Sequence, residues 1–165
     1  LSCHNKEIQM ANVNQSSLTD PLLHEPKGVA SADAGKVYVA NGSGSGTWTS
    51  KETLVGETLT GYIENVSTST KVYVPVPFAG TINKVVTVLE AAIGSSNATI
   101  AVKNASNASM GTITVAHSGS AAGDVDSLSP SSNNTVTADS FITIETNGAS
   151  VNTAALRFVV VLDRS

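Results

Sequence analysis

The feature that most constrains the fold is a series of short segments rich in β-branched residues and separated by clusters of Gly, Asn, Ser or Pro. Seven such segments follow residue 54: 62–63, 71–76, 81–89, 98–102, 111–115, 140–145 and 156–162. Several alternate apolar and polar residues, which is typical of strands with one buried and one solvated face. The series predicts an all-β fold, with a β-sandwich or jelly-roll-like domain over residues 54–165.

Individual segments carry more specific predictions. In the segment 140–145, Ile142 and Ile144 alternate with Phe141, Thr143 and Glu145, so the two sets should occupy opposite faces of one strand. The run 158–162 is continuously apolar, which predicts a central strand or one covered on both faces by a neighbouring subunit. We predict a long loop over residues 118–135, which is either functional or packed on a partner. No long helix is expected.

Residues 10–53 differ in composition from the rest of the chain. Pro21 and Pro26 bias the preceding residues toward extended conformations, and the Gly/Ser run at 42–46 has little to bury. Only 36–40 alternates as a strand would. We therefore predict an extended arm over residues 10–53. Because Met10 begins a start-like sequence, residues 1–9 are interpreted as an upstream or cloning extension.

Composition excludes several classes of function. The chain has 165 residues, of which 13% are charged and 40 are Ser or Thr, so hydroxyls and amides rather than ions solvate its surface. A net charge of −4 argues against nucleic-acid binding. No apolar run approaches the roughly 18 residues of a membrane helix, and no signal-peptide pattern is present. A single cysteine, Cys3, permits neither an internal disulfide nor a zinc-finger site.

No motif indicates an enzyme, a cofactor or a metal. The run 42–46 lacks the Lys-Ser/Thr ending of a phosphate loop, and Asp124 with Asp126 fits a polar turn better than a calcium loop. None of the three histidines lies in a nucleophile signature. Sequence spacing does not exclude a carboxylate pair for glycoside cleavage, since such pairs meet only in space. Sugar-cleaving grooves are usually rich in aromatic residues, however, and after residue 50 the chain has only Tyr62, Tyr73, Phe78, Phe141 and Phe158.

Trp48 is the only tryptophan and follows the Gly/Ser run of the predicted arm. A large aromatic side chain with a polar N–H is typical of interface hot spots. The residue either contacts another molecule or packs on the chain's own β-domain, and the sequence leaves both alternatives open.

The arm also carries a resemblance. The stretch His24-Glu25-Pro26-Lys27-Gly28, together with the Val-Tyr-Val-Ala-x-Gly-x-Gly-Ser-Gly-x-Trp pattern that ends at Trp48, resembles the N-terminal segment of capsid decoration and head-fibre proteins of tailed bacteriophages. The stretch from Gly80 through 120–126 to Gly148 is similar to a small β-domain of phage virion proteins of the same kind. The resemblance implies a non-enzymatic virion component that binds the outside of an assembled capsid, commonly as a trimer. The absence of a long fibrous repeat favours a compact knob.

These observations predict a capsid decoration (cement) protein or short head fibre that stabilises the shell. We expect the arm to bind the major capsid protein on the outer surface of the virion, after assembly in the host cytoplasm, while the β-domain forms a homotrimer. No nucleic acid, membrane, metal or cofactor is expected to take part. The alternative is a tail-fibre or baseplate receptor-binding protein that contacts host glycans. The candidate capsid-binding residues are Leu22, Leu23, His24, Glu25, Pro26, Lys27, Tyr38 and Trp48.

Overall fold

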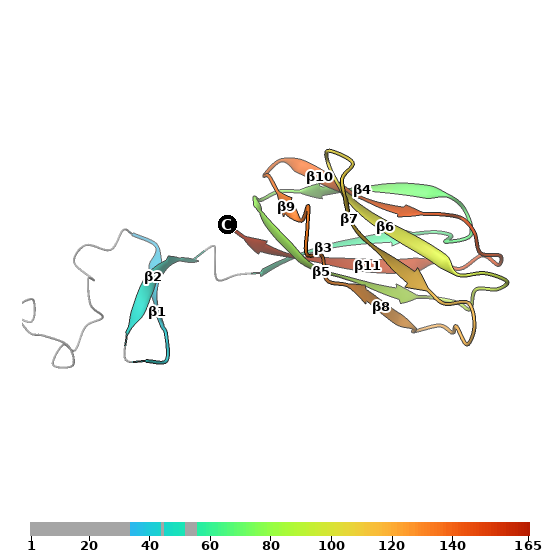
Figure 1. The fold of residues 1–165 in the computed structure, drawn as a ribbon, viewed down its shortest axis with the longest axis horizontal. Helices are drawn as coiled ribbons and strands as arrows, with labels where there is room; N and C mark the ends of the chain where they lie inside the picture. The colour runs from blue at the N-terminus through green and yellow to red at the C-terminus, as the bar shows by residue number, and fades with distance from the viewer. Residues whose placement is uncertain (1–33, 44, 52–55) are drawn as a thin grey trace, which may run out of the picture. The chain divides into compact units, whose positions relative to one another are not determined.

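The computed structural model describes residues 34–43, 45–51 and 56–165, and these residues form an all-β structure (Figure 1). Two compact units separate between Ser50 and Lys51. In the first unit, β1 (Lys36–Ala40) pairs antiparallel with β2 (Gly46–Ser50), and Tyr38 lies opposite Trp48. The described part of the predicted arm is thus a β-hairpin, a pairing that the sequence interpretation did not anticipate.

The second unit is a sandwich of two antiparallel sheets, which confirms the predicted fold class (Figure 1). The four-stranded sheet has the order β4-β10-β6-β7, and the five-stranded sheet has the order β3-β11-β5-β8, with β9 paired to β5. The strands of this unit are β3 (Gly56–Ile63), β4 (Thr70–Val76), β5 (Gly80–Leu89), β6 (Ala98–Asn104), β7 (Ser109–Val115), β8 (Val125–Leu128), β9 (Thr135–Val136), β10 (Ser140–Thr146) and β11 (Leu156–Arg164).

The core lies between the two sheets and follows the alternation of the strands. In β10, Ile142 and Ile144 are completely buried, whereas Phe141 is exposed on the opposite face. The predicted division of this strand into two faces is therefore correct. The sandwich has a single cluster of buried apolar side chains to which both sheets contribute, so it has a core of its own.

The strand β11 is central, as the apolar run 158–162 predicts, because it lies between β3 and β5. Phe158 is 1% exposed and lies opposite Gly61 of β3. A Cβ at Gly61 would overlap the Phe158 ring. Gly61 therefore leaves room for the largest fully buried side chain of the core.

The prediction of a continuous loop over 118–135 is wrong. Residues Val125–Leu128 form the edge strand β8, and Thr135–Val136 form β9; both pair with β5. Leu128 packs against the core while Val125 is exposed. With four residues and two polar positions, β8 lacks the long apolar pattern that marks an interior strand, and its place depends on backbone pairing with β5.

Candidate functional site

Most of the predicted capsid-binding residues fall outside the described part of the chain. Leu22, Leu23, His24, Glu25, Pro26 and Lys27 all belong to this group. Tyr38 and Trp48 are described, and the hairpin places them on the same face of neighbouring strands. Their ring centroids are 5.3 Å apart, with an angle of 63° between the ring planes. This edge-to-face contact leaves both side chains only half-buried.

The Gly/Ser run forms the turn of this hairpin because Asn41 organises it. The Asn41 side-chain oxygen accepts hydrogen bonds from the backbone N–H groups of Ser43 (2.9 Å) and Ser45 (3.2 Å). Gly42 has φ of +76°, a conformation that favours glycine. The turn therefore fixes the register in which Tyr38 meets Trp48.

A second aromatic pair lies on the outer face of the four-stranded sheet of the sandwich. Tyr73 on β4 is 61% exposed and Phe141 on β10 is 38% exposed. Their ring centroids are 5.3 Å apart, with an angle of 68° between the planes. The strands that carry them are directly paired, with Tyr73 opposite Thr143 and Phe141 opposite Pro75. We call Tyr73 and Phe141 the aromatic platform.

A network of charged side chains lies beside the aromatic platform. The Nζ of Lys71 is 2.8 Å from Oε1 of Glu145, and the Nζ of Lys103 is 2.7 Å from Oε2. The Thr143 hydroxyl also donates a hydrogen bond to Oε1 (3.1 Å). Hydrogen bonds from Lys103 and Lys71 lower the pKa of Glu145 to about 2. The hydrogen bond to Glu145 likewise raises the pKa of Lys71, so this group of three carries a net charge of +1 at neutral pH.

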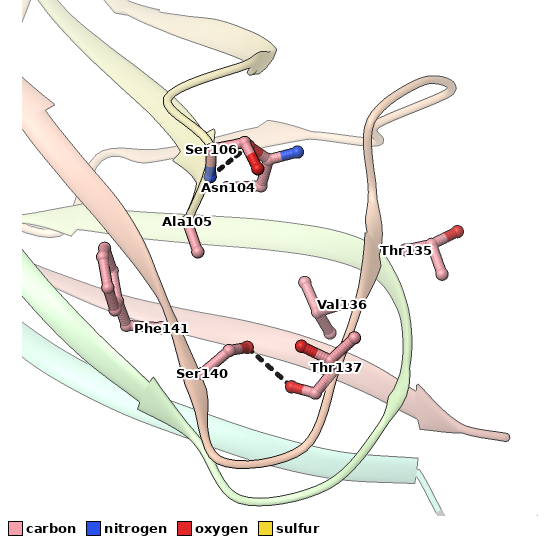
Figure 2. Close-up of a pocket in the computed structure, with 8 residues that line it drawn as sticks. All are labelled: Asn104, Ala105, Ser106, Thr135, Val136, Thr137, Ser140 and Phe141. Atoms are coloured by element: carbon pink, nitrogen blue, oxygen red, sulfur yellow. Dashed lines mark hydrogen bonds between the residues drawn. The ribbon is translucent and has the colours of Figure 1, made fainter.

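Two adjoining hollows open beside the platform. One has a volume of about 240 Å³ and lies between the platform, Lys71 and the β6–β7 turn at Asn107. The other has a volume of about 140 Å³, and Figure 2 shows it between the turn at Asn104–Ser106 and the segment that leads into β10. Phe141 and Ala105 line both hollows. In the smaller one, the Ser140 hydroxyl donates a hydrogen bond to the carbonyl oxygen of Thr137 (2.6 Å; Figure 2).

The turn between β6 and β7 is held rigidly by Asn104. Its side-chain oxygen accepts hydrogen bonds from the backbone N–H groups of Ser106 and Ala108, each at 3.0 Å. Its side-chain N–H group donates to the carbonyl oxygen of Asn133 (3.2 Å), which ties the turn to the segment before β9. Asn107, at the exposed tip, has φ of +63°. The wall that this turn contributes to both hollows is therefore held by hydrogen bonds.

The outer face of the five-stranded sheet is different in character. The cross-strand register places Val159 beside Val86, and Val88 beside Val125. Val125 is 62% exposed, while Val86, Val88, Val159 and Val161 are half-buried. We call these five residues the valine face. At one end, Tyr62 is covered by Arg157, whose guanidinium lies 5.2 Å from the ring centroid.

Other candidate groups from the sequence have structural partners. His117 is exposed, and its Nδ1 lies 2.9 Å from the side-chain oxygen of Asn97. The Asp124 carboxylate accepts a hydrogen bond from the backbone N–H of Ala121 (2.7 Å), as expected for a polar turn. Across 34–43, 45–51 and 56–165, no three His, Cys, Asp or Glu side chains are grouped as a metal ion would require. Among the same residues, no helix has the length and apolar character to span a membrane.

The sequence analysis did not predict that the aromatic platform and the charge network form a site. The available signal was the alternation in 71–76 and 140–145, which places Tyr73, Phe141 and Glu145 at outward positions. Their convergence also requires the pairing of β4 with β10 and of β10 with β6, which the sequence does not specify.

Comparisons with known proteins find similar chains among solved structures. No protein-family model matches the chain, and no curated protein matches it. Among solved structures, a chain of the "Cyanophage Pam1 capsid asymmetric unit" aligns with a TM-score of 0.44 and 14% sequence identity. The alignment covers 67% of this chain and 85% of that chain.

Proposed function

We propose that this protein is a structural component of a bacteriophage virion, a capsid decoration protein or short head fibre that binds the outer surface of the shell. The hairpin and the residues before it attach to the major capsid protein. The sandwich stands outside the shell as a homo-oligomeric knob. Assembly onto the capsid takes place in the host cytoplasm, and no catalytic step is involved.

The observation that carries this proposal is the hairpin. Tyr38 and Trp48 contact each other edge to face and stay half-buried within the hairpin, and a two-stranded hairpin is by itself at best marginally stable in water. Such a unit gains stability when its aromatic face is buried on a larger surface. The resemblance of residues 24–48 to the N-terminal segment of phage decoration and head-fibre proteins supports the outer capsid surface as that larger surface. The sandwich has its own core, so it does not need the hairpin in order to fold.

The valine face supports the homo-oligomeric part of the proposal. Five neighbouring valines on a sheet face form an apolar patch of a kind that soluble proteins usually cover. A second and a third copy of this chain are the proposed cover, which gives a trimer. Light scattering on the full-length protein should give the mass of three chains. A single-chain mass in solution, together with isolated copies on the particle, would contradict the trimer.

Attachment is tested by titrating full-length variants onto undecorated capsids at two ionic strengths. We expect Trp48→Ala and Leu22→Ala to weaken capsid binding more than Lys27→Ala does. Apolar burial should dominate, because an exposed ion pair contributes only about 0–1 kcal/mol. Moderate salt should weaken wild-type binding only mildly. Tyr73→Ala is the matched control, since it removes an exposed aromatic side chain from the sandwich instead of the arm.

Two outcomes would overturn the proposed attachment. One is unchanged co-sedimentation with capsids after deletion of residues 10–53, since the sandwich alone would then carry the affinity. The other is a larger loss for Lys27→Ala than for Trp48→Ala together with release of the wild-type protein by moderate salt. That result would mean that the arm is held electrostatically.

The alternative assignment is a receptor-binding protein of the tail fibre or baseplate. Location separates the two, because decoration proteins cover the head in many copies whereas tail proteins occur in few. Labelling the chain on purified particles and imaging them distinguishes head from tail directly. Label confined to the tail would overturn the capsid proposal.

A further inference from the structure

We propose that the aromatic platform and its two hollows form a binding site for an acidic oligosaccharide. One sugar ring stacks on the exposed face of Tyr73 and contacts Phe141 at its edge, its carboxylate and hydroxyl groups bind the Lys71 ammonium and Asn107, and the next ring occupies the smaller hollow. This inference goes beyond the proposed capsid attachment and does not depend on it.

The first argument is the chemistry around the exposed rings. Tyr73 is 61% exposed, and besides Phe141 and Pro75 its neighbours on the sheet face are the polar residues Lys71, Thr143 and Glu145. The core of a protein–protein interface is depleted of charged residues, and the valine face fits that description better. A sugar ring has an apolar face of C–H groups and an edge of hydroxyls. A small aromatic surface surrounded by hydrogen-bonding groups matches both parts.

The second argument is that the site is already in place. The rings of Tyr73 and Phe141 support each other edge to face on directly paired strands. Asn104 holds the turn that carries Asn107 through hydrogen bonds of 3.0 Å to two backbone N–H groups. A ligand therefore orders few groups when it binds, which reduces the entropic cost of association.

The third argument is the sign of the charge. Lys71 and Lys103 share a single carboxylate, and both oxygens of Glu145 are occupied by them. Each ammonium group has three donors, and Glu145 accepts one from each. The network thus presents N–H donors and a surplus positive charge on a chain whose net charge is −4. Local donors of this kind favour a ligand with carboxylates over a neutral one.

The fourth argument is the size of the hollows. Their volumes of about 240 and 140 Å³ are each below the roughly 300 Å³ of a pocket for a drug-sized molecule. Phe141 lines both hollows, so a ligand can extend from one to the other past its ring. A chain of small linked units fits this arrangement better than one large rigid molecule. The ligand class is therefore an oligosaccharide rather than a single sugar.

The test uses the full-length protein with two probes of equal length, tetragalacturonic acid and the neutral galactotetraose. Binding is followed by calorimetry and by shifts of backbone amide signals in NMR spectra. We expect the acidic probe to bind with a Kd near 1 mM or below, and the neutral probe at least about fivefold more weakly. The shifted amides should cluster at residues 71–73, 104–107 and 140–143.

Variants locate the binding to the platform. Tyr73→Ala and Phe141→Ala should each reduce affinity for the acidic probe by about tenfold, a change worth about 1.4 kcal/mol. Lys71→Gln should reduce the preference for the acidic over the neutral probe and leave the stacking in place. Tyr62→Ala is the matched control, because Tyr62 is a 43% exposed tyrosine on the other sheet and should bind the probe as the wild type does. The NMR spectrum of each variant shows whether it is folded.

Three results would overturn the proposal. The first is the absence of binding of either probe at 10 mM. The second is equal binding of the two probes, which would remove the role given to the lysines. The third is loss of self-association or capsid binding in Tyr73→Ala, which would make the platform a protein interface. A failure of capsid binding in the wild type would overturn the proposed function and leave this site untouched.

Discussion

Replacing Glu145 with glutamine tests whether the charge network on the outer sheet face stabilises the fold. The pKa of Glu145 is lowered from 4.5 to about 2, and a shift of that size corresponds to at most roughly 3 kcal/mol. The side chains of Lys71 and Glu145 are 43% and 17% exposed, so solvent and salt screen the interaction. We therefore expect Glu145→Gln to reduce the free energy of unfolding by about 1–2 kcal/mol at pH 7.

The pH dependence gives the sharper test. A carboxyl group whose pKa is lower in the folded state contributes its full stabilisation above the unfolded value, here about 4.5, and loses it as the pH falls through about 2. The stability difference between wild type and Glu145→Gln should therefore be constant from pH 7 to 5 and shrink to a small fraction at pH 2. Urea unfolding followed by far-UV circular dichroism measures it, because Trp48 fluorescence would report on the hairpin instead of the sandwich.

The control for this experiment is Glu64→Gln, which alters an exposed carboxylate just after β3. This variant should unfold within about 0.5 kcal/mol of the wild type at every pH. A difference for Glu145→Gln that stays equal at pH 7 and pH 2 would refute the electrostatic explanation. It would mean that the substitution acts through packing over the buried Thr143 side chain.

Three further changes test the fold and its surfaces. Gly61→Ala should lower the free energy of unfolding by about 1–3 kcal/mol, because its methyl group would displace the buried Phe158 ring. Gly56→Ala is the control, since a Cβ there meets only ordinary contacts, and it should have little effect in the same denaturant series. Burial raises the pKa of Asp126, so the charged form is disfavoured in the folded state; Asp126→Asn should raise the urea midpoint at pH 7 but not at pH 3. Val159→Lys should convert the proposed homotrimer to single chains in light scattering and leave the far-UV spectrum unchanged.

Local patterns predicted seven of the nine strands of the sandwich, although only the end of β3, and neither β8 nor β9, was among the predicted segments. The alternation of Ile142 and Ile144 with polar or aromatic neighbours identified both faces of β10, and the apolar run at 158–162 identified the central strand β11. These patterns predict burial, because the polarity of each residue indicates whether its side chain faces the core or the solvent. The edge strand β8 has no such signal, because its position depends on main-chain hydrogen bonds to β5.

The candidate site could be predicted only in part for a related reason. Outward positions of Tyr73 and Phe141 follow from alternation, but their contact follows from the pairing of β4 with β10. Strand pairing between distant segments is set by the packing of the whole sandwich, and similar Ser-, Thr- and Val-rich segments allow many pairings. The network at Glu145 needs a third strand, β6, to supply Lys103. A site built from three strands is therefore harder to derive from sequence than any strand within it.

The two outer faces of the sandwich have complementary properties that bear on how the molecule would act on a particle. Sheets that pack face to face direct their outer faces in opposite directions. Self-association through the valine face would therefore leave each aromatic platform pointing away from the contact between subunits. Several such platforms on one oligomer, and many oligomers on one shell, would bind a repetitive acidic glycan far more tightly than a single site with a millimolar Kd. A weak site on each chain is then sufficient for adhesion of the whole particle, and the measured affinity should rise steeply when the probe is presented in many copies on a surface.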